Sequence, residues 1–504
     1  MGDSAISLTT GALHLMNARP NLANIATLFF VSKVGNGYMM IHRRALLRGA
    51  LLVPCASRAF AAQNRVFTPE EFGAKGDGVT NDSAAMARLS TAVRLYGGGT
   101  VEFRRTTYVV GAQGLQVQGA FAFPPRELLT FVGCSLPLHL KGNGARLLCE
   151  PDLRFGVFRD GEPFKHAMPY LGPGVASPYN SMILVEGCTA AVRISDLDLE
   201  GPGDRIMVGG QYGDTGWQIL STGLILRNNA GSEIVERVRT HRHCQDGMMI
   251  DGVDADTPGV ERSLVRVTAD SNGRQGCSIV GGRGYRFAGC SFTRSARGSI
   301  KSAPGAGVDI EAEGKKHVRD LAFSKCLFSD NGGCGMVADS GDTERVRFEN
   351  CTFIGTVNWS AWPSKPFFKF EDCTFVGAMT RAFGDSTVAP ATTFARCTFD
   401  DDPARSPTGE VFGGGDATAP MVNLGNNQNV SFDKCRFSAL HGSVLPWSTG
   451  AIYRDCTMAK GDRAFGYPRG QFVGTNRITG KVDLYNSKIS GVLTVNGRLI
   501  PPSR

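Results

Sequence analysis

The chain has 504 residues, of which 42% are hydrophobic and 20% charged, and its net charge is +8. This composition is typical of a globular protein with one large domain or two to three average ones. The charge is modest for the length and no long Lys/Arg block occurs, which argues against nucleic-acid binding. A mildly basic surface remains compatible with an acidic polymer as partner.

Residues 40–62 have the layout of a signal peptide. Arg43 and Arg44 precede an apolar run, and the small residues of AFAA end at Ala62. The adjacent arginines match a twin-arginine signal, so we expect an exported bacterial protein, periplasmic or secreted, with no membrane association after cleavage. Met40 is then the natural start, and residues 1–39 are an upstream extension. The alternative is a chance arginine pair before a buried helix.

Residues 63–125 contain two glycine-rich motifs that flank a predicted helix. The motifs read EFGAKGDGVTNDS at 71–83 and GGGTVEFRRTTY at 97–108. Residues 83–96 between them favour a helix, with Ser83 or Asp82 as its N-cap. The arrangement resembles the start of the pectate-lyase-like superfamily, which includes rhamnogalacturonase/epimerase-type and glycoside hydrolase family 28-related proteins, lyases and phage tailspikes.

The resemblance implies an all-β chain, a right-handed single-stranded parallel β-helix whose open end is capped by the short helix. Family members usually have Pro and Gly before the Thr-Tyr pair, where this chain has Arg104, Arg105 and Thr106. The polygalacturonase-type signatures Asn-Thr-Asp, Gly-His-Gly and Arg-Ile-Lys are absent, so we do not expect a standard pectin hydrolase. A fold specifies little about reaction, because function lies in sites grafted onto it.

A repeat independently predicts a solenoid over residues 126–460, followed by C-terminal strands or a cap at 461–504. A Cys-x-Phe or Cys-x-Met pattern begins at 290, 326, 351, 373, 397, 435 and 456. Short β-rich segments surround each cysteine, which is typical of a parallel β-helix with one repeat per coil. A cysteine at one place in a repeat behaves as a small buried residue, so we expect free thiols rather than disulfides.

A second register comes from glycines that open strands, at positions 223, 247, 276, 307 and 335. One and three positions after each glycine the residues are apolar, and we expect both columns to face the core. The first column is Leu224, Met248, Cys277, Val308 and Met336; the second is Leu226, Ile250, Ile279, Ile310 and Ala338. Four positions before three of these glycines stand His243, Asn272 and Asn331, where Asn predicts a turn that its side chain stabilises.

The columns between and after these core positions face outward and carry acids. Asp309 and Glu311 lie on one predicted strand, with Asp339 and Asp251 on other coils. Neighbouring coils are about 4.8 Å apart and same-face neighbours on a strand about 7 Å apart, so these carboxylates approach the separations of glycosidase pairs. We therefore predict Asp309 and Glu311 as the main catalytic carboxylates, assisted by Asp339 and Asp251. The alternative is the hydrated face of an ordinary strand.

Several residues around the acids are candidates for substrate binding. The segment 293–304 is longer than its counterparts in adjacent coils and basic, and the insertions 154–180 and 201–218 are rich in Gly, Pro and aromatic residues. His243 also fits a structural role at its coil corner. The candidates are Arg274, Gln275, Arg297, Lys301, His243, Tyr212 and Trp217.

These patterns predict an exported enzyme that hydrolyses an acidic polysaccharide, without metal or cofactor. One rival is a polysaccharide lyase or uronate epimerase on the same scaffold, in which Lys316 or Arg319 acts as base and calcium is bound by carboxylates. The other rival is a carbohydrate-binding or surface-assembly protein without catalysis. Zinc-ligand spacing, phosphate-binding loops and dinucleotide fingerprints are absent. The sugar, the stereochemistry and the oligomeric state stay open.

Overall fold

The computed structural model describes residues 65–111, 114–117, 120–122, 127–156, 158–159, 162–163, 181–209, 218–413, 420–462 and 466–503. The described residues belong to one compact unit. The predicted extension (1–39) and signal peptide (40–62) lie outside the described residues, as do Tyr212 and Trp217. No helix in the described ranges is long and apolar enough to cross a membrane.

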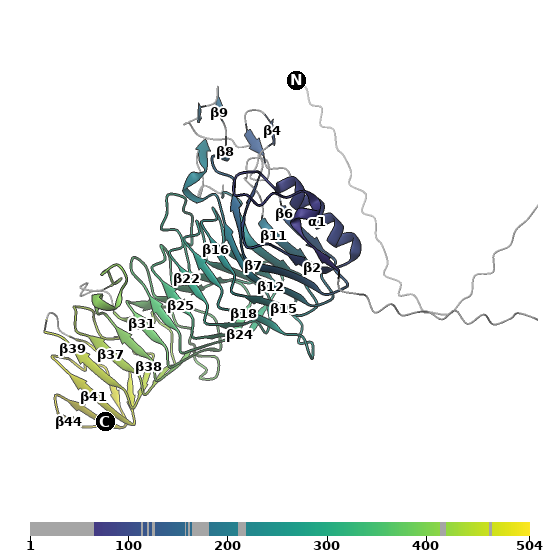
Figure 1. Ribbon diagram of the computed structural model, residues 1–504. Coiled ribbons are helices and arrows are strands. Elements are labelled where there is room, and N and C mark those ends of the chain that lie inside the picture. Colours follow the sequence, from purple (N-terminus) through teal and green to yellow (C-terminus); the bar gives the residue numbers. More distant parts are fainter. Residues whose placement is uncertain are drawn as a thin grey trace, which may run out of the picture. The chain divides into compact units, whose positions relative to one another are not determined.

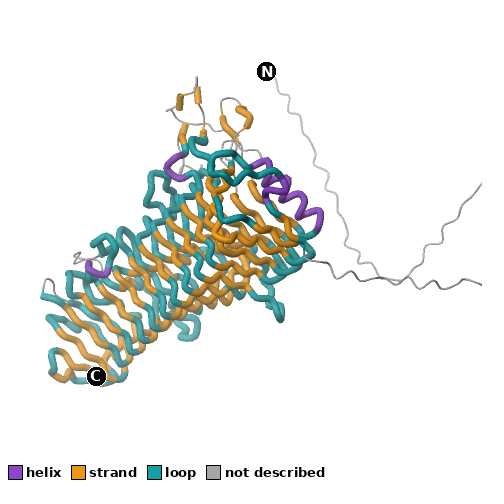
Figure 2. The backbone as a smooth tube through the Cα atoms, in the orientation of Figure 1, coloured by secondary structure: helices purple, strands orange, loops and turns teal. Residues whose placement is uncertain are grey.

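Residues 63–504 wind into a solenoid of parallel strands, which Figures 1 and 2 show as stacked coils. In most coils the chain passes through a front, a side and a back strand. Each pairs in parallel with its counterparts on the neighbouring coils. The front sheet comprises β6 (Glu127–Val132), β11 (Ser181–Glu186), β14 (Thr222–Arg227), β17 (Met248–Asp251), β20 (Cys277–Arg283), β23 (Val308–Ile310), β26 (Met336–Ala338) and β29 (Ala361–Pro363).

The side and back strands stack in the same way over a longer stretch of chain. Two long strands, β7 (Leu138–Cys149) and β12 (Val192–Glu200), run through both positions. The side strands are β15 (Glu233–Glu236), β18 (Arg262–Val265), β21 (Arg286–Ala288), β24 (Val318–Ser324), β27 (Thr343–Glu349), β30 (Phe368–Glu371), β33 (Thr393–Ala395), β36 (Val430–Asp433), β38 (Ala451–Arg454), β40 (Gln471–Val473) and β42 (Lys488–Ile489). The back strands are β16 (Arg239–His241), β19 (Thr268–Asp270), β22 (Ser291–Thr293), β25 (Leu327–Ser329), β28 (Thr352–Ile354), β31 (Thr374–Val376), β34 (Thr398–Asp400), β37 (Arg436–Ala439), β39 (Thr457–Lys460), β41 (Thr475–Thr479) and β43 (Val492–Val495).

The remaining elements close the ends or lie on loops. At the first end β1 (Val66–Phe67), β2 (Gly99–Glu102) and β3 (Thr107–Val110) join the sheet, and at the last end β44 (Arg498–Ile500) pairs antiparallel with β43. Short pairs are β4 (Gly114–Val117) with β5 (Ala120–Ala122), β8 (Arg154–Gly156) with β13 (Met207–Gly209), β9 (Phe158–Arg159) with β10 (Glu162–Pro163), and β32 (Met379–Thr380) with β35 (Val422–Asn423). Three-residue or four-residue 3-10 helices span Pro69–Phe72, Gly203–Arg205 and Pro403–Arg405.

The predicted helix is α1 (Ser83–Tyr96), which lies over the first end of the solenoid in Figure 1. Its N-cap is Asp82, whose carboxylate accepts the backbone N–H groups of Lys75 at 2.7 Å and Gly76 at 3.0 Å rather than those of the helix. The apolar face of α1 is buried through Met86, Leu89 and Val93, so the helix covers the end of the core. A capped end shields the first coil from pairing with other chains.

Both predicted core columns of the front sheet are confirmed. All ten side chains are fully buried, and the strands pair in the register that the glycines predict, as in Leu224 with Met248 and Cys277 with Val308. The corner asparagines also act as predicted, since Asn272 accepts the N–H of His243 at 3.1 Å and Asn331 that of Ser295 at 3.0 Å. These bonds satisfy buried backbone groups where the chain turns into the front sheet.

The repeated cysteines and phenylalanines form two kinds of ladder inside the solenoid. Every cysteine in the described residues is free and buried, as the repeat predicts. The ring of Phe348 stacks on Phe323 and on Phe370 with centroids 4.8 Å apart in each case. Parallel in-register strands bring identical side chains on successive coils into contact, so the same residue type stabilises each coil against the next.

Candidate functional site

The carboxylate of Asp309 lies at the middle of the front sheet. Val308 and Ile310 of β23 point into the core, so Asp309 between them points outward. Its register partners are Ser278 on β20 and Val337 on β26. These residues belong to one outward row that crosses the coils, and we call it the front row: Met249, Ser278, Asp309, Val337 and Trp362.

Although Asp309 faces outward, its side chain is only 7% exposed. Its Oδ2 accepts a hydrogen bond from Nε2 of Gln275, and its Oδ1 has no hydrogen-bond partner in the described residues. Burial raises the pKa of Asp309 to about 7; the charges of Glu311, Asp339 and Asp246 act in the same direction and that of Arg274 opposes them. A carboxyl group with this pKa retains its proton in a large fraction of molecules at neutral pH.

Asp246 and Arg274 form a buried ion pair beside Asp309. The Asp246 side chain is inaccessible to solvent, and Arg274 donates from Nε to Oδ1 at 2.8 Å and from Nη2 to Oδ2 at 2.6 Å. Burial acts to lower the pKa of Arg274, but the Asp246 carboxylate outweighs it and the pKa is raised. Arg274 also donates from Nη1 to Gln218 Oε1 at 3.2 Å, which ties the pair to the end of the segment 201–218.

Ser278 connects this ion pair to Asp309 through Gln275. The Ser278 hydroxyl lies 2.8 Å from Oδ2 of Asp246 and also contacts Oε1 of Gln275, and its single proton serves one of these acceptors at a time. Gln275 in turn donates to Asp309. Sequence reasoning predicted Arg274 and Gln275 as substrate-binding residues; in the structure Gln275 is hydrogen-bonded to Asp309 and Arg274 to Asp246. It assigned no role to Asp246 or Ser278, although Asp246 directly precedes a register glycine and Ser278 lies in the outward column.

The other predicted acids follow the ends of the front strands. Glu311 is half-buried and accepts a hydrogen bond from the Ser340 hydroxyl, and Asp339 is exposed. Asp339 follows Val337, the register partner of Asp309, by two residues, just as Glu311 follows Asp309, and the charges of both act to raise the pKa of Asp309. Asp309 and Glu311 therefore combine a buried carboxyl group whose pKa is raised with a more accessible carboxylate.

Asp251 departs from the predicted alignment. A bulge between β17 and β20 pairs Asp251 with Gly281, whereas the glycine register placed it opposite Val280. Its carboxylate lies 2.7 Å from Nζ of Lys316 and 3.4 Å from Nε of Arg227. Asp251, the last residue of β17, is thus ion-paired with both Lys316 and Arg227.

The predicted binding residues occupy different settings. Arg297 pairs with Asp330 at 3.3 Å and Lys301 is exposed, both on the segment 293–304. Ser299 in that segment donates its N–H to Asp204 at 3.2 Å, which anchors the segment to the 3-10 turn Gly203–Arg205. His243 is 1% exposed with Nε2 3.1 Å from the carbonyl oxygen of Leu199, and burial lowers its pKa to about 3, so its ring is neutral and away from solvent.

The elements of the lyase hypothesis are also separated. Lys316 is paired with Asp251, whereas Arg319 lies on the side strand β24 and pairs with Asp342 at 3.4 Å. Among the described residues, no group of three or more His, Cys, Asp or Glu side chains is arranged to hold a metal ion.

Comparisons with known proteins agree with this fold. Residues 181–399 match the family described as the right handed beta helix region. No curated protein sequence matches the chain. The parallel coils and this match show a right-handed parallel β-helix fold, which the resemblance to pectate-lyase-like proteins predicts.

Several solved β-helix structures are similar to the chain at low identity. The A-module of mannuronan C-5 epimerase AlgE4 from Azotobacter vinelandii is 15% identical with a TM-score of 0.41, and the match covers 85% of this chain and 100% of that one. The tailspike gp49 of Acinetobacter baumannii bacteriophage Fri1, a capsular polysaccharide depolymerase, is 14% identical with a TM-score of 0.39, and the match covers 84% of this chain and 64% of that one. The N-terminal fragment of bacteriophage Phi29 gene product 12 is 12% identical with a TM-score of 0.46, and the match covers 85% of this chain and 70% of that one. Likenesses of this size assign no reaction or substrate.

Proposed function

We propose that this β-helix protein cleaves glycosidic bonds of a polysaccharide on its front sheet, with Asp309 as the proton donor. The observation that carries the proposal is the buried Asp309 carboxyl, whose pKa is raised to about 7 and whose Oδ1 has no partner in the described residues. A glycosidic oxygen leaves as an alcohol only if it gains a proton, and a carboxylic acid kept protonated near neutral pH supplies it.

Glu311 supplies the second carboxylate of the reaction. It follows Asp309 by two residues at the end of β23, and its side chain is less buried than that of Asp309. In this role it activates water or attacks the sugar carbon, depending on the separation of the two carboxyl groups in the bound state. Ser340 orients Glu311 through its hydroxyl, and the exposed Asp339 adds negative charge that favours the protonated form of Asp309.

Arg274, Asp246, Ser278 and Gln275 act as positioning residues. The bidentate pair of Arg274 with Asp246 forms one end of a hydrogen-bond network. The Ser278 hydroxyl and the Gln275 amide extend this network to Oδ2 of Asp309. Because Oδ2 accepts the Gln275 amide N–H, the proton of Asp309 belongs on Oδ1, which is buried and has no hydrogen-bond partner in the described residues. A network of buried hydrogen bonds holds a reacting group in one geometry at little cost during the reaction.

The proposal is tested with a panel of neutral and acidic polysaccharides, assayed in parallel for new reducing ends and for ultraviolet-absorbing product. Hydrolysis gives reducing ends alone, whereas a lyase also gives the unsaturated, absorbing product. On a polymer that is cleaved, Asp309→Asn and Glu311→Gln should each lower kcat by roughly 100-fold or more, the usual size of a general acid–base contribution. The matched control is Glu349→Gln, which removes a carboxylate on the side strand β27.

Each outcome has a distinct meaning. Reducing ends that disappear in both variants but persist in Glu349→Gln support hydrolysis at Asp309. Absorbing product that depends on Lys316 instead would support a lyase, for which Lys316 beside Asp251 is the available base. Binding without any product would support the carbohydrate-binding alternative and contradict the proposal.

A further inference from the structure

The front row continues past Asp309 to an aromatic residue. Asp309 is in register with Val337, and Val337 with Trp362 on β29. Ala361 and Pro363 flank Trp362 and are buried, so its side chain leaves the same face of the front sheet as Asp309. Two coil spacings of about 4.8 Å place the Trp362 backbone about 10 Å from that of Asp309.

Trp362 holds an arginine over its ring. Its side chain is half-buried against Val337, and the guanidinium carbon of Arg381 lies 5.1 Å from the centre of the indole. Arg381 follows β32 on the next coil, and its backbone N–H donates to the carbonyl oxygen of Asn423 at 2.7 Å. Cation–π contact with tryptophan restricts the guanidinium without using its N–H donors.

Arg381 lacks the carboxylate partner that many arginines of the described residues have. Arg396, for example, makes a bidentate pair with Asp372, with bonds of 2.8 and 2.7 Å, and Arg345 lies 2.7 Å from Asp320. Arg381 is exposed and has no carboxylate partner in the described residues. An exposed guanidinium that is already oriented and has free donors is suited to bidentate recognition of an anionic group.

We propose that Arg381, oriented on Trp362, binds an anionic group of the polysaccharide, a carboxylate or a sulfate, on a sugar unit next to the one that reacts at Asp309. This inference rests on the proposed function for the position of the cut, and it adds the substrate class, an acidic polysaccharide. The polymer then runs along the front row, across the coils. Glu311 and Asp339 exclude anionic groups near the reacting bond, and Arg381 selects them at the neighbouring position.

Binding tests the anion site without any turnover. Affinity electrophoresis of the full chain compares alginate, which carries carboxylates, dextran sulfate, which carries sulfates, and neutral dextran. We expect Arg381→Ala to weaken binding to one of the two anionic polymers by roughly ten-fold or more, as for a lost charge-assisted bond. Binding to dextran should not change. The preferred polymer distinguishes carboxylate from sulfate.

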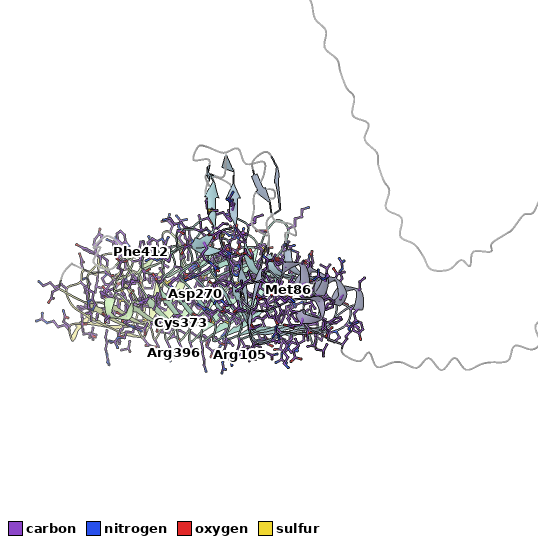
Figure 3. All side chains as sticks on the ribbon, turned by 45° about the horizontal axis from the view of Figure 1, so that its top comes forward. Met86, Arg105, Asp270, Cys373, Arg396 and Phe412 are labelled. Atoms are coloured by element: carbon purple, nitrogen blue, oxygen red, sulfur yellow. The ribbon has the colours of Figure 1, made fainter. Side chains whose placement is uncertain are left out.

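Arg396→Ala is the matched control. It removes an arginine that is ion-paired with Asp372. Figure 3 shows Arg396 on the opposite edge of the solenoid from Phe412. The ring centroids of Phe412 and Trp359 are 4.8 Å apart, and Trp359 packs against the same buried cluster as Trp362. Arg381→Lys keeps the charge but loses the planar fork, and we expect it to bind with intermediate affinity. Equal retardation of wild type, Arg381→Ala and Arg396→Ala by every polymer, or no retardation of wild type by either anionic polymer, would overturn the inference.

Turnover separates this inference from the proposed function. On a cleaved acidic polymer, Arg381→Ala should raise KM with little change in kcat, and carboxyl reduction or desulfation of the polymer should abolish the difference. If Asp309→Asn abolishes turnover while Arg381→Ala leaves KM unchanged, only the anion site is wrong. If Asp309→Asn turns over normally while Arg381→Ala still weakens binding, only the proposed reaction is wrong.

Discussion

Asp309 and Ser278 stand in register on neighbouring coils, and Gln275 links them by contacting the hydroxyl of one and the carboxyl of the other. The link matters because Asp309 is a buried acid with no directly bound cation among the described residues. The nearest cation in the network, Arg274, is committed to Asp246 by two hydrogen bonds. Asp309 therefore exists in a setting that favours its protonated form.

The first prediction concerns stability and pH. The pKa of Asp309 is raised in the folded protein to about 7 from 3.8. Between these values the folded chain binds more protons than the unfolded chain, so its stability falls as pH rises through the window. We expect a loss of up to about 4 kcal/mol from pH 4 to pH 8. Asp309→Asn should lack this contribution and be more stable than wild type at pH 8.

Urea unfolding of wild type and Asp309→Asn at several pH values measures the effect, and Glu349→Gln serves as the control. The same pH dependence in wild type and Asp309→Asn would show that Asp309 ionises normally.

The second prediction concerns the buried pair of Asp246 and Arg274. Arg274→Gln leaves Asp246 buried without its cation and should cost about 3–5 kcal/mol. Asp246→Asn combined with Arg274→Gln should cost less than the sum of the two single changes, because neither partner is left uncompensated. Chemical unfolding of the four proteins gives this coupling. The exposed pair Arg396 and Asp372 is the control, and breaking it should cost much less because water screens both charges. Additive costs at Asp246 and Arg274 would contradict the account.

The third prediction concerns the aromatic ladder. Phe348 is fully buried between Phe323 and Phe370, so Phe348→Ala should destabilise the solenoid by about 3–5 kcal/mol through lost burial and a cavity. Phe367, which is 36% exposed, is the comparison, and Phe367→Ala should have a much smaller effect. Thermal unfolding measures both. Equal effects would mean that stacking between coils does not determine stability.

The fourth prediction concerns export. Replacing Arg43 and Arg44 by lysine should retain the protein in the cytoplasm of a bacterial host, because twin-arginine export depends on the arginine pair. Cell fractionation followed by detection of the chain measures this, with Arg48→Lys as the control. Free thiols agree with folding in a reducing compartment, since every cysteine of the described residues is unpaired. Unchanged export in the double variant would remove the twin-arginine interpretation.

Much of the solenoid follows from the sequence alone, because a parallel coil repeats its chemistry at each turn. Glycines at strand starts, asparagines at corners and cysteines beside phenylalanines all mark fixed places, and the register of Val308 with Met336 follows from them. The acids could be predicted as outward-facing for the same reason. The burial of these acids could not be predicted, because residues from other coils cover the outer face of a strand. The hydrogen bond between Gln218 and Arg274 is one such contact.

The sequence repeat does not predict some features of the site. The bulge that moves Asp251 opposite Gly281 adds one residue locally, and a periodic pattern carries no signal of it except the neighbouring glycines 281 and 282. Gln275, Ser278 and Asp246 act together only through side-chain directions that spacing does not specify. Trp362 belongs to the front row in the structure, but its strand lacks the opening glycine that located the other members.

The most direct test is the pH dependence of kcat/KM for wild type and Asp309→Asn on a polysaccharide that the protein cleaves. We expect the wild-type rate to fall as pH rises above about 7, where Asp309 loses its proton. Asp309→Asn should be at least about 100-fold slower and lack this limb. An Asp309→Asn protein that retains the wild-type rate and the same alkaline limb would contradict the central claim.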